Sequence, residues 1–153
     1  MGKRVFKHLG LGALVVFAAM QAFRPDMAAP PTEPGMTLDA LYAPPPEVAR
    51  LLRAACYDCH SHETRWPWYS QVAPASWLVA HDVEHAREQM NFSTFGAEAL
   101  EDRAFYLEEC ARKVRESEMP LRSYTWLHAD ARLAQEDRER LAGWFEEAAG
   151  RAR

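Results

Sequence analysis

The residue types best suited to chemistry lie together in one run, Cys56-Tyr57-Asp58-Cys59-His60. This is the CxxCH spacing of a c-type haem attachment site. Two thiols three positions apart at a helix end can add to the two vinyl groups of one porphyrin, and the adjacent imidazole then lies close enough to ligate the iron. The pattern predicts one haem c, held by thioether bonds from Cys56 and Cys59, with His60 as the proximal iron ligand.

Two alternatives to haem exist for a CxxC pair, namely a zinc site and a thioredoxin-like redox centre. A zinc ribbon needs a second ligand pair, whereas the chain has one further cysteine, Cys110. A thioredoxin-like site follows a strand, whereas a helical pattern runs into this motif. The sequence therefore favours haem over a haem-free zinc or dithiol protein. Cys110 is predicted to be a buried apolar residue, with a cross-link between two chains as the alternative.

The second axial position of the iron needs a donor from elsewhere in the chain. Met119 is followed by Pro120 in a polar segment where a helix should end, and a methionine in such a loop can project its thioether onto a haem. Met/His ligation raises the potential into the range useful for electron transfer. Met119 is therefore the predicted distal ligand. His81, His128, Met90 and a vacant position are the alternatives.

Aromatic and basic side chains follow the motif closely. A haem presents a large apolar disc, and indole or phenol rings can wall it in while their N–H and O–H groups reach its polar edges. Arginine side chains can pair with its propionates. Any one ring has core packing away from the haem as its alternative. The predicted haem pocket comprises Arg65, Trp66, Trp68, Tyr69, Trp77 and Tyr124.

The elements that position these residues are predicted to be helices. Apolar residues recur at spacings of three and four in four stretches, and strand alternation is nowhere sustained. The four helices are expected after the prolines 44–46, from about Ala75, across 100–114, and across 141–148 after an acidic turn. The predicted fold is all-α, a cytochrome c-like bundle of about four helices around one covalent haem.

Residues 1–23 differ in kind from the rest of the chain. Three basic residues precede an apolar run from Leu9 to Phe23, which is typical of a signal peptide or a membrane anchor. The nearest cleavage sites for a signal peptidase have Met20 or Met27 at position −3, where a small residue is preferred, so an uncleaved anchor is favoured over a cleaved leader. The basic end is expected to stay in the cytoplasm while the remainder is exported.

Residues 24–46 contain seven of the ten prolines, which favours an extended polyproline II linker. The c-type haem-binding domain is then expected over residues 47–153. The chain has 18 Lys+Arg against 22 Asp+Glu, a net charge of −4. This charge provides no attraction for phosphate backbones, so nucleic-acid binding is not expected.

Three stretches of the chain resemble the small bacterial haem-binding domain proteins. They are CYDCHSHETRWPWYSQVAPASWLVAHDV at 56–83, REQMNFSTF at 87–95 and EMPLRSYTWLHADARL at 118–133. The resemblance implies covalent attachment of a single haem at the CxxCH motif, and makes Met119 the leading sixth ligand by likeness to cytochromes c. The chain departs from the family pattern at Leu121, where family members often have a second proline, and none of its departures removes a proposed ligand.

The predicted function is periplasmic electron transfer by a c-type cytochrome with both axial positions filled, which is an electron carrier and not an enzyme. Its partners would be a periplasmic or membrane redox protein, reached from a membrane tether formed by residues 1–23. An acidic chain suits a basic partner face. The alternative is a haem-based gas or peroxide sensor or enzyme, in which the distal site is open or exchangeable.

Overall fold

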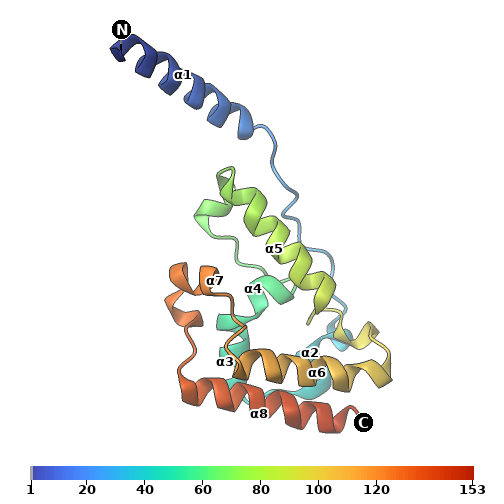
Figure 1. The fold of residues 1–153 in the computed structure, drawn as a ribbon. Helices are drawn as coiled ribbons and strands as arrows, with labels where there is room; N and C mark the ends of the chain where they lie inside the picture. Colours follow the sequence, from blue (N-terminus) through green and yellow to red (C-terminus); the bar gives the residue numbers. More distant parts are fainter. Residues whose placement is uncertain (1) are drawn as a thin grey trace.

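The computed structural model describes residues 2–153, with side chains from residue 4 onward. All regular structure in this range is helical, which confirms the all-α prediction. The longer helices are α1 (Gly2–Met20), α3 (Pro46–Ala55), α5 (Ala75–Gln89), α6 (Leu100–Arg115) and α8 (Gln135–Arg151) (Figure 1). The shorter elements are α2 (Leu38–Tyr42), α4 (Tyr57–His60), α7 (Arg122–Leu127) and the 3-10 turns η1 (Pro34–Met36), η2 (Trp68–Gln71), η3 (Phe95–Ala97) and η4 (Ala129–Ala131).

The four predicted helices are confirmed as α3, α5, α6 and α8, and each follows from local sequence. Pro46 occupies the first turn of α3, where its missing N–H costs nothing. Helices α6 and α8 both have acidic residues in the first turn and basic residues in the last, which complements the helix dipole. Periodicity did not indicate α2, α4 and α7, because four to six residues are too few to show a helical repeat.

Helices α6 and α8 lie side by side and form the largest helix–helix contact of the molecule, with α3 packed against α8 (Figure 1). Each helix turns one apolar stripe inward, and these stripes meet the segment that follows α5. Burial of this apolar surface is the main force that holds the domain together. The core includes Leu51 and Leu52 of α3, Phe92 and Phe95 after α5, Leu107 and Val114 of α6, and Leu141, Trp144 and Phe145 of α8.

The second half of the predicted linker belongs to this core. Leu38 and Tyr42 of α2 are buried. The ring of Tyr42 packs edge-on against Phe95, with 5.9 Å between ring centroids, and the Leu38 backbone N–H donates to the Phe92 carbonyl at 2.8 Å. Prolines lie on either side of α2, and their number in this part of the sequence predicts extended structure. The short helix between them, with two apolar residues on one face, was therefore not predicted. The packed domain therefore begins upstream of the predicted boundary at residue 47.

The first half of the predicted linker and the residue before it, Phe23, are extended but are held against the domain. The indole N–H of Trp77 donates to the carbonyl of Phe23 at 2.6 Å. The indole N–H of Trp66 donates to the carbonyl of Met27 at 3.1 Å. Two tryptophans of the predicted haem pocket thus use their polar atoms to bind the N-terminal segment.

Helix α1 carries the apolar run, and its residues from Arg4 to Ala19 are exposed. Within residues 2–153, no helix has both the length and the apolar character needed to cross a membrane. The basic residues occupy the first two turns of α1, so its uncharged part spans roughly 20 Å at about 1.5 Å per residue, less than the ~30 Å of a hydrocarbon core.

Candidate haem site

The CxxCH motif is presented by a break between two helices. Cys56 ends α3 by donating its N–H to the Leu52 carbonyl at 2.9 Å, and its own carbonyl then accepts from the N–H groups of Cys59 and His60. These two hydrogen bonds to the Cys56 carbonyl form a single new helical turn, α4. Both thiols and the imidazole are therefore carried by five consecutive residues of defined geometry. Cys56 and Cys59 are half-buried and are not bonded to each other.

The thiols of the motif lie in a desolvated environment. Burial raises the pKa of Cys59 to about 11, with a further contribution from the neighbouring carboxylates of Asp58 and Asp82. Burial likewise raises the pKa of Cys56, and Cys110 adds to this shift. Cys110 is half-buried and packs against the core, a less complete burial than the sequence predicts.

The imidazole of His60 is oriented by a hydrogen bond to the Met90 backbone carbonyl. Its Nδ1 lies 3.0 Å from the Met90 carbonyl. A carbonyl only accepts, so Nδ1 carries the proton in this hydrogen bond and Nε2 keeps its lone pair in the neutral ring. Burial lowers the pKa of His60 more than the carbonyls of Met90 and Ala86 raise it. His60 is therefore a neutral imidazole with Nε2 ready to bind a metal, the arrangement typical of metal-ligating histidines.

Asp58, between the two cysteines, is a buried acceptor for four hydrogen bonds. Its Oδ1 accepts from the Arg65 backbone N–H and Nε, both at 3.0 Å. Its Oδ2 accepts from Arg65 Nη2 at 2.9 Å and from the Tyr124 hydroxyl at 2.7 Å. Burial raises the pKa of Asp58, but the hydrogen bonds from Arg65 and Tyr124 outweigh burial and lower it below its usual value. Arg65, predicted to lie in the haem pocket, thus uses its guanidinium to bind Asp58.

An aromatic stack joins η2 to α7 beside the motif. The ring of His128 stacks on Tyr124 with 4.0 Å between centroids, and Tyr69 meets His128 edge-on at 6.3 Å. Trp68 in turn meets Tyr69 edge-on and is 80% exposed. Of the predicted pocket residues, the structure therefore gathers Tyr69, Tyr124 and Trp68 in one cluster. His128 holds this cluster together, a role that the sequence did not indicate.

A family model for the haem-binding domain matches residues 15–147. The chain belongs to the haem-binding domain family. This assignment confirms the resemblance inferred from the sequence and confirms haem binding. No curated protein and no solved structure matches the chain.

The side chains around the motif fit a haem. Helix α7 buries none of its residues, although it contains Trp126 and Leu127, which are 73% and 66% exposed. Together with the exposed Trp68 of η2, these are large apolar side chains that the domain core does not use. An apolar disc is suited to cover such side chains. The donor set matches as well, because His60 offers a neutral nitrogen and the two cysteines offer unbonded thiols.

The predicted distal ligand, Met119, lies in the turn between α6 and α7. Its backbone N–H donates to the Lys113 carbonyl at 3.1 Å, and its carbonyl accepts from Arg138 Nη1 at 2.9 Å. These bonds fix the backbone of Met119, and iron ligation by its thioether stays a prediction. The alternative ligand Met90 is buried in the core, and its carbonyl serves the proximal His60.

A zinc site has little support around the same cysteines. Structural zinc takes four ligands from cysteine, histidine or carboxylate side chains. In the part of the chain that the structure describes, no three such side chains come together in a way that would hold a metal ion.

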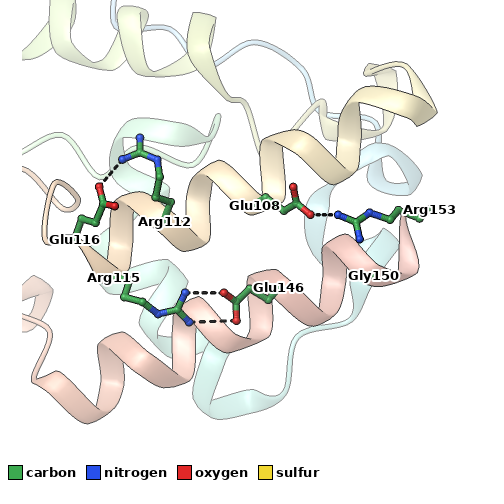
Figure 2. Close-up of a pocket in the computed structure, with 7 residues that line it drawn as sticks. All are labelled: Glu108, Arg112, Arg115, Glu116, Glu146, Gly150 and Arg153. Atoms are coloured by element: carbon green, nitrogen blue, oxygen red, sulfur yellow. Dashed lines mark hydrogen bonds and ion pairs between the residues drawn. The ribbon is translucent and has the colours of Figure 1, made fainter.

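A separate groove with a volume of about 490 Å³ lies along α6 and α8 (Figure 2). Its side chains pair with one another across the groove, as Arg115 does with Glu146 at 2.6 Å. Paired charges make a poor wall for an apolar disc, so this groove is not the haem site. Its lining comprises Glu108, Arg112, Arg115, Glu116, Glu146, Gly150 and Arg153.

Proposed function

We propose that the domain carries one haem c, bonded covalently to Cys56 and Cys59, with His60 as the proximal iron ligand. The observation that carries this proposal is the orientation of His60. This residue lies in the same turn as the two thiols, and its Nδ1 is held by the Met90 carbonyl from outside that turn. Each thiol would add across one vinyl group, forming a sulfur–carbon bond while its hydrogen passes to the adjacent carbon. This addition releases no leaving group and needs no oxidant.

The proposed role is electron transfer with Met119 as the distal ligand. Met119 is half-buried in the turn that leads into α7, and Tyr124 ties α7 to the motif. With both axial positions filled, the iron exchanges electrons and offers no site to a substrate, so the domain is a carrier and not an enzyme. The net charge of −4 suits a redox partner with a basic face. Export of the domain by the basic and apolar N-terminal segment would place this partner in the periplasm or its membrane.

Intact-mass and absorption spectroscopy test the covalent haem. The full chain, produced with haem-attachment machinery, is expected to exceed its polypeptide mass by one haem and to keep that mass after denaturation. The double variant Cys56→Ala with Cys59→Ala should lose it, whereas Cys110→Ala is the matched control and should retain it. A wild-type protein with the mass of the polypeptide alone would refute the proposal. The intact mass also reports whether residues 1–23 remain on the exported protein.

A second candidate function is a gas or peroxide sensor or enzyme with an open distal site. The observation in its favour is the cluster of Tyr69, Tyr124 and His128 beside the motif, whose polar atoms could hydrogen-bond to an iron-bound ligand. Carbon monoxide separates the two roles. A reduced low-spin spectrum that carbon monoxide leaves unchanged supports the electron carrier, and rapid carbon monoxide binding supports the sensor or enzyme.

A further inference from the structure

Helix α7 is joined to the rest of the domain by few side-chain contacts. It buries no residue, and its most extensive contact with another element is with η4, its neighbour in the chain. Its own geometry is nevertheless well defined, because Arg132 donates to the carbonyls of Thr125 and Trp126 at the end of the helix. Arg132 thus ties the segment 122–132 together, and few bonds outside the segment fix its placement.

The shortest external bond of this segment runs to the haem attachment motif. The Tyr124 hydroxyl donates to Asp58 Oδ2 at 2.7 Å, across 66 positions of sequence. The Tyr124 ring cannot turn away freely, since the His128 ring stacks on it and His128 Nδ1 donates to the Tyr124 backbone carbonyl at 3.0 Å. On the other side, Arg65 fixes the carboxylate of Asp58 through three hydrogen bonds. Both ends of the Tyr124–Asp58 bond are thus held in place.

We propose that Asp58 is a positioning residue, which places α7 and the adjoining Met119 turn relative to the iron through its hydrogen bond to Tyr124. This inference rests on the proposed function, because it needs a distal ligand to position. Met119 lies three residues before α7 begins at Arg122. Lys113 of α6 and Arg138 of α8 hold its backbone, and the Tyr124–Asp58 bond holds the α7 end of the same turn. Asp58 is 7% exposed and already accepts from Arg65, so it supplies a preformed acceptor that holds Tyr124 in one orientation.

The test removes one hydroxyl group from the holoprotein. Tyr124→Phe keeps the ring that stacks on His128 and deletes the bond to Asp58. Loss of a hydrogen bond to a charged group is expected to weaken distal ligation about tenfold or more, so added imidazole should bind the ferric protein about tenfold or more tightly. Tyr106→Phe is the matched control, because Tyr106 is half-buried in α6 and its hydroxyl makes no hydrogen bond within residues 2–153. Asp58→Asn removes the carboxylate from the other end and should change imidazole binding in the same direction.

Four outcomes distinguish this inference from the proposed function. Tighter imidazole binding and a weaker methionine–iron absorption band in Tyr124→Phe, with Tyr106→Phe unchanged, support it. Unchanged binding and spectrum in both Tyr124→Phe and Asp58→Asn overturn it while the covalent haem stands. A wild-type protein that carries haem but binds imidazole without competition also overturns it, because no distal ligand is then displaced. A wild-type protein without haem overturns the proposed function and this inference together.

Discussion

Truncation of Leu38 tests whether α2 belongs to the haem-binding domain. Leu38 is fully buried, and Leu→Ala at such core sites removes about 3 kcal/mol or more of stability through lost burial and the cavity that remains. This is a large part of the roughly 5–15 kcal/mol that stabilises a typical domain. For a domain of this size, the loss corresponds to a fall in Tm of about 10 °C. The backbone hydrogen bond from residue 38 to the Phe92 carbonyl does not depend on the side chain and should persist.

Leu41→Ala is the matched control, since Leu41 lies in the same short helix and is 39% exposed. The same truncation there is expected to change stability by about 0.5 kcal/mol or less, as for most surface positions. Thermal and urea unfolding of the haem-loaded full chain measures both variants. Equal and small effects of Leu38→Ala and Leu41→Ala would show that α2 does not pack into the core, and would return the domain boundary to residue 47.

Three further substitutions probe individual side-chain contacts of the domain. Trp77→Phe removes the N–H that binds the Phe23 carbonyl. The free energy that holds the N-terminal segment against the domain should fall by about 1 kcal/mol, so proteases should cut residues 24–32 about fivefold faster. An unchanged cleavage rate would argue against a docked segment. Tyr57→Phe removes the 2.6 Å hydrogen bond to Asp39 and should lower the free energy of unfolding by about 1.5 kcal/mol in urea titrations. Arg115→Ala should leave Tm unchanged, because its ion pairs with two glutamates are exposed, and a clear fall in Tm would contradict this.

The sequence predicted the long helices because their apolar residues repeat over three or more turns. It did not predict α2, since Leu38 and Tyr42 are its only buried residues and prolines flank it on both sides. The composition of residues 24–46 indicates extended structure, whereas two apolar side chains at the right spacing decide how residues 38–42 pack. Proline content describes the backbone that a segment prefers, and burial of a few side chains can still fold it onto a core.

The candidate site was predictable where the spacing along the chain carries the chemistry. The CxxCH run places two thiols and an imidazole in one turn, and the fold keeps them there. The Met90 carbonyl that orients His60 was not predictable, because a backbone acceptor 30 positions away leaves no signature in residue type. The same applies to Arg65, which the sequence assigns to a propionate and the structure pairs with Asp58.

The two residues between the cysteines, Tyr57 and Asp58, take no part in haem attachment itself. Their side chains make the hydrogen bonds that join the motif to other parts of the domain. Tyr57 is buried and donates to Asp39 of α2, near the start of the packed domain. Asp58 accepts from Tyr124 of α7, in its C-terminal part. One turn therefore holds the chemical groups of the site and joins segments from both ends of the domain. Because Asp39 of α2 and Tyr124 of α7 both bond to this turn, we expect folding and haem ligation to be coupled. Substitution at position 57 or 58 should then alter the haem spectrum while both cysteines and His60 remain intact.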